Sequence, residues 1–266
     1  MGSSNYPESH TWTLSGTYPS LDPVTAESVP VIDLNDPNAI SLIRHASEKW
    51  GVFQVTNHGI PMALIEEVEF EARRLFTLPT ERKLLAVRSP DGLTGYGLAR
   101  ISNFFPKLMW YEGFSIVGSP VEHARQLWPH DHTKFCNVIE EVPERVCPDP
   151  GHAMGLAPHT DSSLVTLLYQ SSTNGLQVLK DNMGWVTVQP LKGAIVVNVG
   201  PTPDFHSSTS MAHPETVKIS PSMKLTDSDH PPLYRQVSWK EYLDAKAKHF
   251  DKALGLIRSD VLAANM

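Results

Sequence analysis

The chain has 266 residues, 41% of them hydrophobic, so it can form one large domain or two small ones. Its net charge of −7, without any basic run, argues against nucleic acid or an anionic membrane surface as a partner. Its two cysteines, Cys136 and Cys147, are too few for the disulfide framework of a secreted protein. No stretch approaches the ~20 apolar residues of a membrane span, and residues 1–30 contain no apolar signal segment. We therefore expect an acidic cytoplasmic protein.

The first half of the chain alternates predicted strands and helices. Residues 1–28 are polar and rich in Pro and Ser, which predicts a flexible lead. Asp36 followed by Pro37 is typical of a helix start, and Gly51 is typical of a helix end. In chain order we expect a strand at 29–34, a helix at 36–50, a strand at 52–59, a helix at 62–78, a Gly-rich loop at 88–100, a helix after a capping box at 119–122, and a helix at 132–141.

After residue 148 the apolar pattern changes from helical to alternating. Strands are expected at 163–169, 176–179, 185–188 and 194–199, separated by turns rich in Gly, Asn and Asp. Such closely spaced strands are typical of an antiparallel sandwich or barrel. The pattern stops after Gly200, and an amphipathic helix is expected much later, at 238–258.

A His-Thr-Asp step, His159 and Asp161, precedes the first of these strands in GLAPHTDSSLVTLLYQ. Two residues apart on an extended chain, both side chains point to the same face. A neutral imidazole and a carboxylate suit Fe(II), and a third ligand on that face would leave the opposite face open for a chelating co-substrate and dioxygen. A bare His-x-Asp step is weak evidence by itself, so an exposed strand start is the competing interpretation. Its place at the expected mouth of a barrel favours a metal site.

Longer stretches around this step resemble a known family. MGLAPHTDSSLVTLLYQ and GLQVLKDNMGWVTVQPLKGAIVVNVG resemble the catalytic core of plant Fe(II)/2-oxoglutarate dioxygenases, and VPVIDL, WGVFQVTNHGIP and LFTLPTERK resemble their N-terminal region. YGLARISNFFPKLMWYEGFSIVGSP, VKISP and PPLYRQVSWKEYLDAKAKHFDKALGLIR are similar to the gibberellin 3-oxidase (gibberellin 3-beta-dioxygenase) subfamily. One departure is Tyr111, where that subfamily usually has Ser.

The resemblance implies an α+β, mainly β fold: an incomplete double-stranded β-helix (a jelly roll, isopenicillin N synthase-like) with flanking helices. It implies Fe(II) as the metal, held by His159, Asp161 and a distal His, with 2-oxoglutarate as co-substrate and ascorbate as a further additive. It also implies a gibberellin, a diterpenoid acid, as substrate. By this reading the chain consists of the lead at 1–28, an N-terminal dioxygenase region at 29–141, a truncated β core at 148–221 and a helical tail at 222–266.

Two segments of the family have no counterpart here. One lies between Glu141 and Cys147 and carries, in the family, a Tyr that contacts 2-oxoglutarate. The other lies between Gly200 and Lys218 and carries the distal His and an Arg-x-Ser clamp. Residues 201–217 are too short and too rich in Pro to form the family's returning strands, and they contain no Arg. His213, in SMAHP, is the better candidate for the third ligand, and His206 is the other; a solvated loop histidine is the competing interpretation for both.

Three functional hypotheses therefore remain. The first is an Fe(II)/2-oxoglutarate-dependent oxidoreductase that hydroxylates gibberellins at the 3-beta position. The second is a catalytically inactive truncated or splice-variant relative that lacks the distal His and the 2-oxoglutarate Arg. The third is a protein with a weak two-ligand metal site and no turnover. Trp110 is expected either to line a substrate pocket or to belong to the core. Structural or polar-surface roles are expected for the remaining histidines and cysteines singled out: His58, His123, His130, His132, Cys136 and Cys147.

Overall fold

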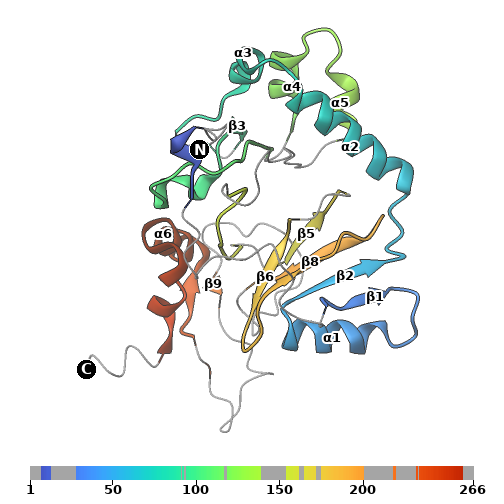
Figure 1. Ribbon diagram of the computed structural model, residues 1–266, viewed down its shortest axis with the longest axis vertical. Helices are drawn as coiled ribbons and strands as arrows, with labels where there is room; N and C mark the ends of the chain where they lie inside the picture. Colours follow the sequence, from blue (N-terminus) through green and yellow to red (C-terminus); the bar gives the residue numbers. More distant parts are fainter. Residues whose placement is uncertain are drawn as a thin grey trace, which may run out of the picture. The chain divides into compact units, whose positions relative to one another are not determined.

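In the computed structural model the chain forms two compact units. Figure 1 labels many of their helices and strands. The sheet unit comprises residues 28–58, 158–170 and 194–266, and the hairpin unit comprises residues 1–27, 59–157 and 171–193. Within them the structure describes residues 7–12, 28–90, 92, 94–116, 119–138, 154–161, 165–171, 175–200, 218–219, 232 and 234–259.

The sheet unit is built on a four-stranded mixed sheet. Its strands are β1 (Val31–Asp33), β2 (Val52–Thr56), β8 (Ile195–Val199) and β5 (Val165–Tyr169), in that spatial order. β1 and β2 are parallel, whereas β8 runs antiparallel to both β2 and β5. Val197 stands opposite Phe53 on one side and Leu167 on the other, so this register joins three distant parts of the chain.

That pairing bears on the expected domain organisation. β2 comes from the predicted N-terminal region and β8 from the predicted β core, yet the two strands pair along four residues of register. The strands' apolar periodicity identified both elements but carried no information on their partners. The expected consecutive regions therefore share one sheet.

Helix α1 (Ala39–Lys49) packs on this sheet, as the apolar cluster of the unit shows (Figure 1). The helix starts slightly later than expected, because Asp36 Oδ1 accepts the Asn38 N–H at 2.7 Å and forms a turn before the first helical residue. Gly51 follows the helix end with φ +68°, a conformation that favours glycine. The cluster consists of Ile32, Ala39, Ala46, Phe53, Val55, Ile195 and Val197.

The C-terminal part of the sheet unit contains β9 (Lys218–Ile219), β10 (Val237–Ser238) and helix α6 (Trp239–His249). The single helix expected at 238–258 is wrong beyond His249. Phe250 has φ +48°, which ends the helix, and two 3-10 turns follow, η4 (Phe250–Lys252) and η5 (Gly255–Ile257). These turns bring Ile257 back to a small core with Val237 and Tyr242.

The hairpin unit contains most of the helices and two antiparallel hairpins, β3–β4 and β6–β7. Its main core gathers Leu75, Phe76, Phe114, Leu127 and Phe135 from elements that are far apart in sequence. In chain order its elements are η1 (Glu8–His10), α2 (Met62–Phe76), α3 (Thr80–Lys83), η2 (Leu84–Ala86), β3 (Gly95–Gly97), η3 (Arg100–Phe104), β4 (Gly113–Ser115), α4 (Val121–Leu127), α5 (Thr133–Val138), β6 (Gln177–Lys180) and β7 (Gly184–Thr187).

Two expectations in this unit need correction. The lead was expected to be flexible, but within residues 7–12 the Trp12 ring is buried and its Nε1 donates to the Leu108 carbonyl at 2.9 Å. A large aromatic side chain that finds an apolar site and a hydrogen-bond acceptor outweighs the polar composition around it. The stretch 88–100 was expected to be loop, but it contains β3, whose partner β4 lies further along the chain.

The remaining sequence expectations concern caps and membrane spans. The capping box expected at 119–122 does not form, since α4 begins at Val121 after Pro120; the Ser119 hydroxyl instead accepts the Val121 N–H at 3.4 Å. Among the described residues no helix has the length and apolar character needed to cross a bilayer.

Candidate functional site

His159 and Asp161 lie together just before β5, in the sheet unit. The His159 Nε2 and Asp161 Oδ1 atoms are 3.5 Å apart, and both side chains are about 30% exposed, at 31% and 27%. The two side chains meet, as the spacing predicts. The pair is thus partly accessible from solvent, while the Asp161 side chain contacts the sheet at Asn198.

The Asp161 carboxylate is held by donors from the neighbouring strands. Asn198 of β8 donates from Nδ2 at 3.3 Å, and the Thr166 side chain of β5 also hydrogen-bonds to it. The hydrogen bond with His159 holds the pKa of Asp161 well below its usual range; burial opposes this, and Thr166 and Asn198 reinforce it. The carboxylate is therefore ionised throughout the neutral pH range, as a metal ligand must be.

This pair fits two positions of a site for a divalent transition metal. An imidazole nitrogen and an ionised carboxylate oxygen 3.5 Å apart can contact one ion, because bonds to such donors are about 2.1 Å long. Within the described ranges no cluster of three or more His, Cys, Asp or Glu side chains is suited to hold a metal. His206 and His213, the candidates for the third ligand, lie outside the described residues, so their assignment stays a prediction.

Sequence reasoning missed the groups that hold Asp161. Asn198 interrupts the apolar run of β8, and a polar residue inside such a run is the signal that could have identified it. Thr166 carries no such signal, because Thr is common in strands. Both residues reach Asp161 only through the antiparallel pairing of β5 with β8, which places Thr166 directly opposite Asn198.

Trp110 and the other residues singled out from the sequence lie apart from this pair in the chain. Trp110 is half-buried, and its ring meets the His10 ring edge-on, with the two ring centroids 5.3 Å apart.

His123 was expected on a polar face but is half-buried. Its Nε2 lies 3.0 Å from Thr94 Oγ1, and its ring is edge-on to the Phe114 ring. Burial raises the pKa of the half-buried Cys136 thiol. His58 is half-buried in the turn after β2, His132 is half-buried, His130 is exposed, and Cys147 lies outside the described residues.

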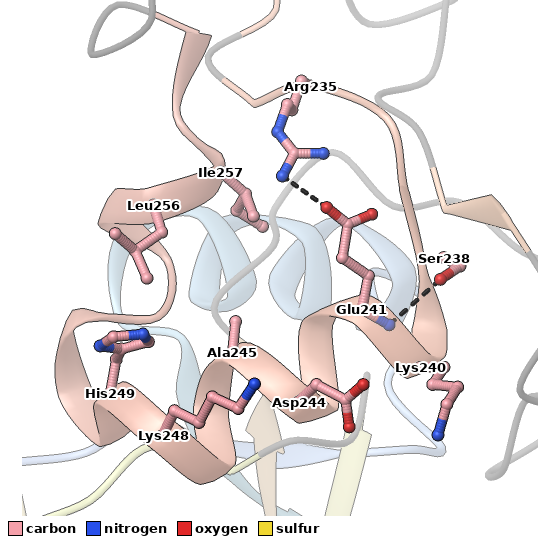
Figure 2. Close-up of a pocket in the computed structure, with 10 residues that line it drawn as sticks. All are labelled: Arg235, Ser238, Lys240, Glu241, Asp244, Ala245, Lys248, His249, Leu256 and Ile257. Atoms are coloured by element: carbon pink, nitrogen blue, oxygen red, sulfur yellow. Dashed lines mark hydrogen bonds and ion pairs between the residues drawn. The ribbon is translucent and has the colours of Figure 1, made fainter.

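A hollow on the surface of the sheet unit is lined by α6 and η5 (Figure 2). Arg235 pairs with Glu241 across it at 2.6 Å, and the exposed Lys240, Asp244 and Lys248 add charges of both signs. His159 and Asp161 do not line it.

Comparison with protein families assigns most of the chain. Residues 29–134 match the model of the non-haem dioxygenase in morphine synthesis N-terminal domain, and residues 133–221 match that of the 2OG-Fe(II) oxygenase superfamily. The gibberellin 3-beta-dioxygenase 1 of Pisum sativum is 43% identical over 326 residues, which takes in 95% of this chain and 87% of that protein. The gibberellin 3-beta-dioxygenase 1 of Arabidopsis thaliana is 40% identical over 327 residues, with 95% and 90% covered.

Two of the solved structures that resemble this chain cover most of it. JOX2 in complex with 2OG, Fe and JA has a TM-score of 0.76 at 21% identity, covering 97% of this chain and 95% of that one. The dioxygenase for auxin oxidation in rice has a TM-score of 0.68 at 21% identity, covering 87% and 100%. This likeness confirms the predicted fold, a jelly roll with flanking helices.

The alignments also bear on the segments that this chain lacks. The alignment with the pea protein runs over 326 residues, whereas the chain has only 266. The relative therefore carries stretches with no counterpart in this chain.

Proposed function

We propose that this chain, which belongs to the gibberellin 3-beta-dioxygenase family of 2OG-Fe(II) oxygenases, hydroxylates a gibberellin at the 3-beta position. The observation that carries the proposal is the His159–Asp161 pair, with its two donor atoms 3.5 Å apart and its carboxylate held ionised. The pair lies in the segment that matches the 2OG-Fe(II) oxygenase superfamily. The relatives named for this reaction support the choice of substrate class.

His159 Nε2 and the Asp161 carboxylate are the proposed Fe(II) ligands contributed by the segment before β5. Bound Fe(II) supplies the activation of dioxygen and a common point of attachment for the co-substrate. Asn198 and Thr166 orient the carboxylate, so that the ligand does not have to be ordered when the metal arrives. His213 remains the proposed third ligand, with His206 as the alternative.

The proposed reaction consumes one gibberellin, one 2-oxoglutarate and one dioxygen. It yields one hydroxylated gibberellin, one succinate and one carbon dioxide, so that one oxygen atom goes to each organic product. The electrons that reduce dioxygen come from the oxidative decarboxylation of 2-oxoglutarate and from the substrate C–H bond. Ascorbate is included in the assay to keep the iron reduced.

Product analysis under isotopically labelled dioxygen tests this proposal. The purified chain is incubated with Fe(II), 2-oxoglutarate, ascorbate and a gibberellin that lacks the 3-hydroxyl. We expect a product one oxygen heavier, with the label in the new hydroxyl group at the 3-beta position. A folded preparation that leaves the gibberellin unchanged would contradict the proposal.

A specific observation favours a second candidate, a non-catalytic member of the same family. Residues 201–217 contain no Arg to pair with the far carboxylate of 2-oxoglutarate, and the aligned relative is longer than this chain. A Lys could supply charge to that carboxylate but not the two-pronged contact of a guanidinium. Under this alternative, the labelled product and succinate are both absent although the protein is folded.

The cytoplasm is the proposed location, on the basis of the few cysteines and the composition of the chain. The proposed small-molecule partner is a diterpenoid acid, the gibberellin substrate. A fractionation of cells that express the chain tests this location, with recovery in the membrane pellet as the contradicting result.

A further inference from the structure

Lys246 of helix α6 contacts the residue between the two candidate metal ligands. Its Nζ donates to the carbonyl oxygen of Thr160 and lies 3.2 Å from the Thr160 Oγ1. The two residues are 86 positions apart in sequence, so the contact belongs to the tertiary structure. It joins the C-terminal helix to the His-Thr-Asp step.

The partial burial of Lys246 favours its contact with Thr160. Lys246 is half-buried, and a buried ammonium group is costly unless its protons are donated to acceptors. Thr160 supplies two acceptors, one from the main chain and one from the side chain. Burial lowers the pKa of Lys246, and the negative charge of Asp161 opposes that shift. The ammonium group therefore also interacts electrostatically with the candidate ligand.

The consequence for the site follows from the position of Thr160 in the chain. The orientation of the Thr160 peptide sets the directions in which the flanking His159 and Asp161 side chains leave the backbone. Asn198 and Thr166 hold the carboxylate end of Asp161, and the contact with Lys246 holds the backbone between the ligands. The pair is thereby held both by the strands and by α6.

We propose that Lys246 is a positioning residue for the metal site, which fixes the Thr160 backbone so that His159 and Asp161 reach one ion together. This inference rests on the proposed function, since it takes the pair to be metal ligands. It makes α6 a functional part of the site and not only a cover for the small C-terminal core.

The matched control is Lys248 of the same helix. Lys248 is exposed and lines the surface hollow beside Ala245 and His249 (Figure 2). Exchanging Lys246 or Lys248 for Met removes the same charge from the same helix. Only the first exchange removes the contact with Thr160.

The experiment measures Co(II) binding by visible absorption in the wild-type chain and in Lys246→Met, Lys246→Arg and Lys248→Met. We expect Lys246→Met to weaken Co(II) binding by about 10-fold and to alter the absorption bands, as loss of a group that orients a ligand does. Lys246→Arg retains a cationic donor and is expected to recover part of the affinity, while Lys248→Met matches the wild type. Thr160→Val, which removes only the hydroxyl acceptor, is expected to shift the affinity in the same direction as Lys246→Met and to a smaller extent.

Hydrogen exchange in the metal-free proteins provides a readout independent of catalysis. Peptides that cover 158–161 are expected to exchange faster in Lys246→Met, while those of β2 and β8 keep the wild-type rate. Wild-type affinity and wild-type exchange in Lys246→Met and Thr160→Val would overturn the inference and leave the proposed function intact. A wild-type chain that binds no Co(II) would overturn both.

Discussion

At the scale of single residues, Lys83 and Glu112 form a deeply buried ion pair outside the candidate site. Lys83 is 1% exposed and donates to Glu112 Oε2 at 2.8 Å and to the Phe76 carbonyl at 3.2 Å. The Tyr96 hydroxyl donates to the same carboxylate oxygen, and the ammonium also faces the Tyr96 ring. This group links α3, β3 and the segment before β4.

Breaking that pair is expected to destabilise the hairpin unit strongly. Lys83→Met leaves the Glu112 charge buried without its cation, which costs about 3–5 kcal/mol of the free energy of unfolding. Urea unfolding followed by fluorescence measures the change.

The control for this prediction is Arg44→Ala, which breaks an exposed pair with Glu48 on α1. Exposed pairs of this kind contribute about 0.3–0.5 kcal/mol. If Lys83→Met cost no more than Arg44→Ala, the buried pair would not be the stabilising contact described here.

At the scale of elements, the end of α1 depends on the backbone conformation of Gly51. Its φ of +68° lies in the left-handed region, and no described atom lies within 4 Å of the position a Cβ would occupy. Gly51→Ala is therefore expected to lower the free energy of unfolding by about 1 kcal/mol through backbone strain alone. Denaturant unfolding measures it.

Gly155 provides the matched control for Gly51. A Cβ at Gly155 also meets no described atom within 4 Å, but the backbone there is not left-handed. Gly155→Ala should leave stability unchanged or slightly raised. Equal losses for both variants would show that strain at Gly51 does not account for the effect.

The start of α6 makes the stability of this helix depend on pH. Glu241 accepts from Arg235 at 2.6 Å, and this bond is the main cause that holds the pKa of Glu241 below its ordinary value; the Ser238 N–H adds to it. A carboxyl with a depressed folded pKa stabilises the fold above its unfolded pKa of about 4.3, and this stabilisation is lost as the pH falls through the folded pKa.

The test compares the melting temperatures of the wild type and Glu241→Gln between pH 6 and pH 3. The wild type should melt higher near pH 6, and the difference should shrink toward pH 3 as Glu241 is protonated. A difference that stays constant over this range would rule out the charged Arg235–Glu241 contact as its source.

The elements themselves were largely predictable, whereas their partners were not. The structure has β5, β6, β7 and β8 where strands were expected at 163–169, 176–179, 185–188 and 194–199. Every strand end lies within two residues of its expected position. Alternation and turn residues determine a strand locally, so one sequence suffices to find it. The pairing of β2 with β8 depends on residues that are distant in the chain, which local patterns do not encode.

At the scale of the whole molecule, the same distinction applies to the candidate site. His159 and Asp161 were predictable as neighbours, because two residues on one extended segment need no tertiary information. Asn198 and Lys246 reach the pair from β8 and α6, and only the folded chain brings them there. The sequence therefore identified the proposed ligands, and the fold identified the groups that hold them.

The most direct test of the central claim is the release of succinate from 2-oxoglutarate under air with Fe(II). The purified chain is measured with and without a gibberellin that lacks the 3-hydroxyl, beside an Asp161→Ala variant of equal folded content. We predict that the gibberellin stimulates succinate release in the wild type and that Asp161→Ala abolishes this stimulated release. A folded wild-type chain that releases no succinate, or an Asp161→Ala variant that releases as much as the wild type, would contradict this account.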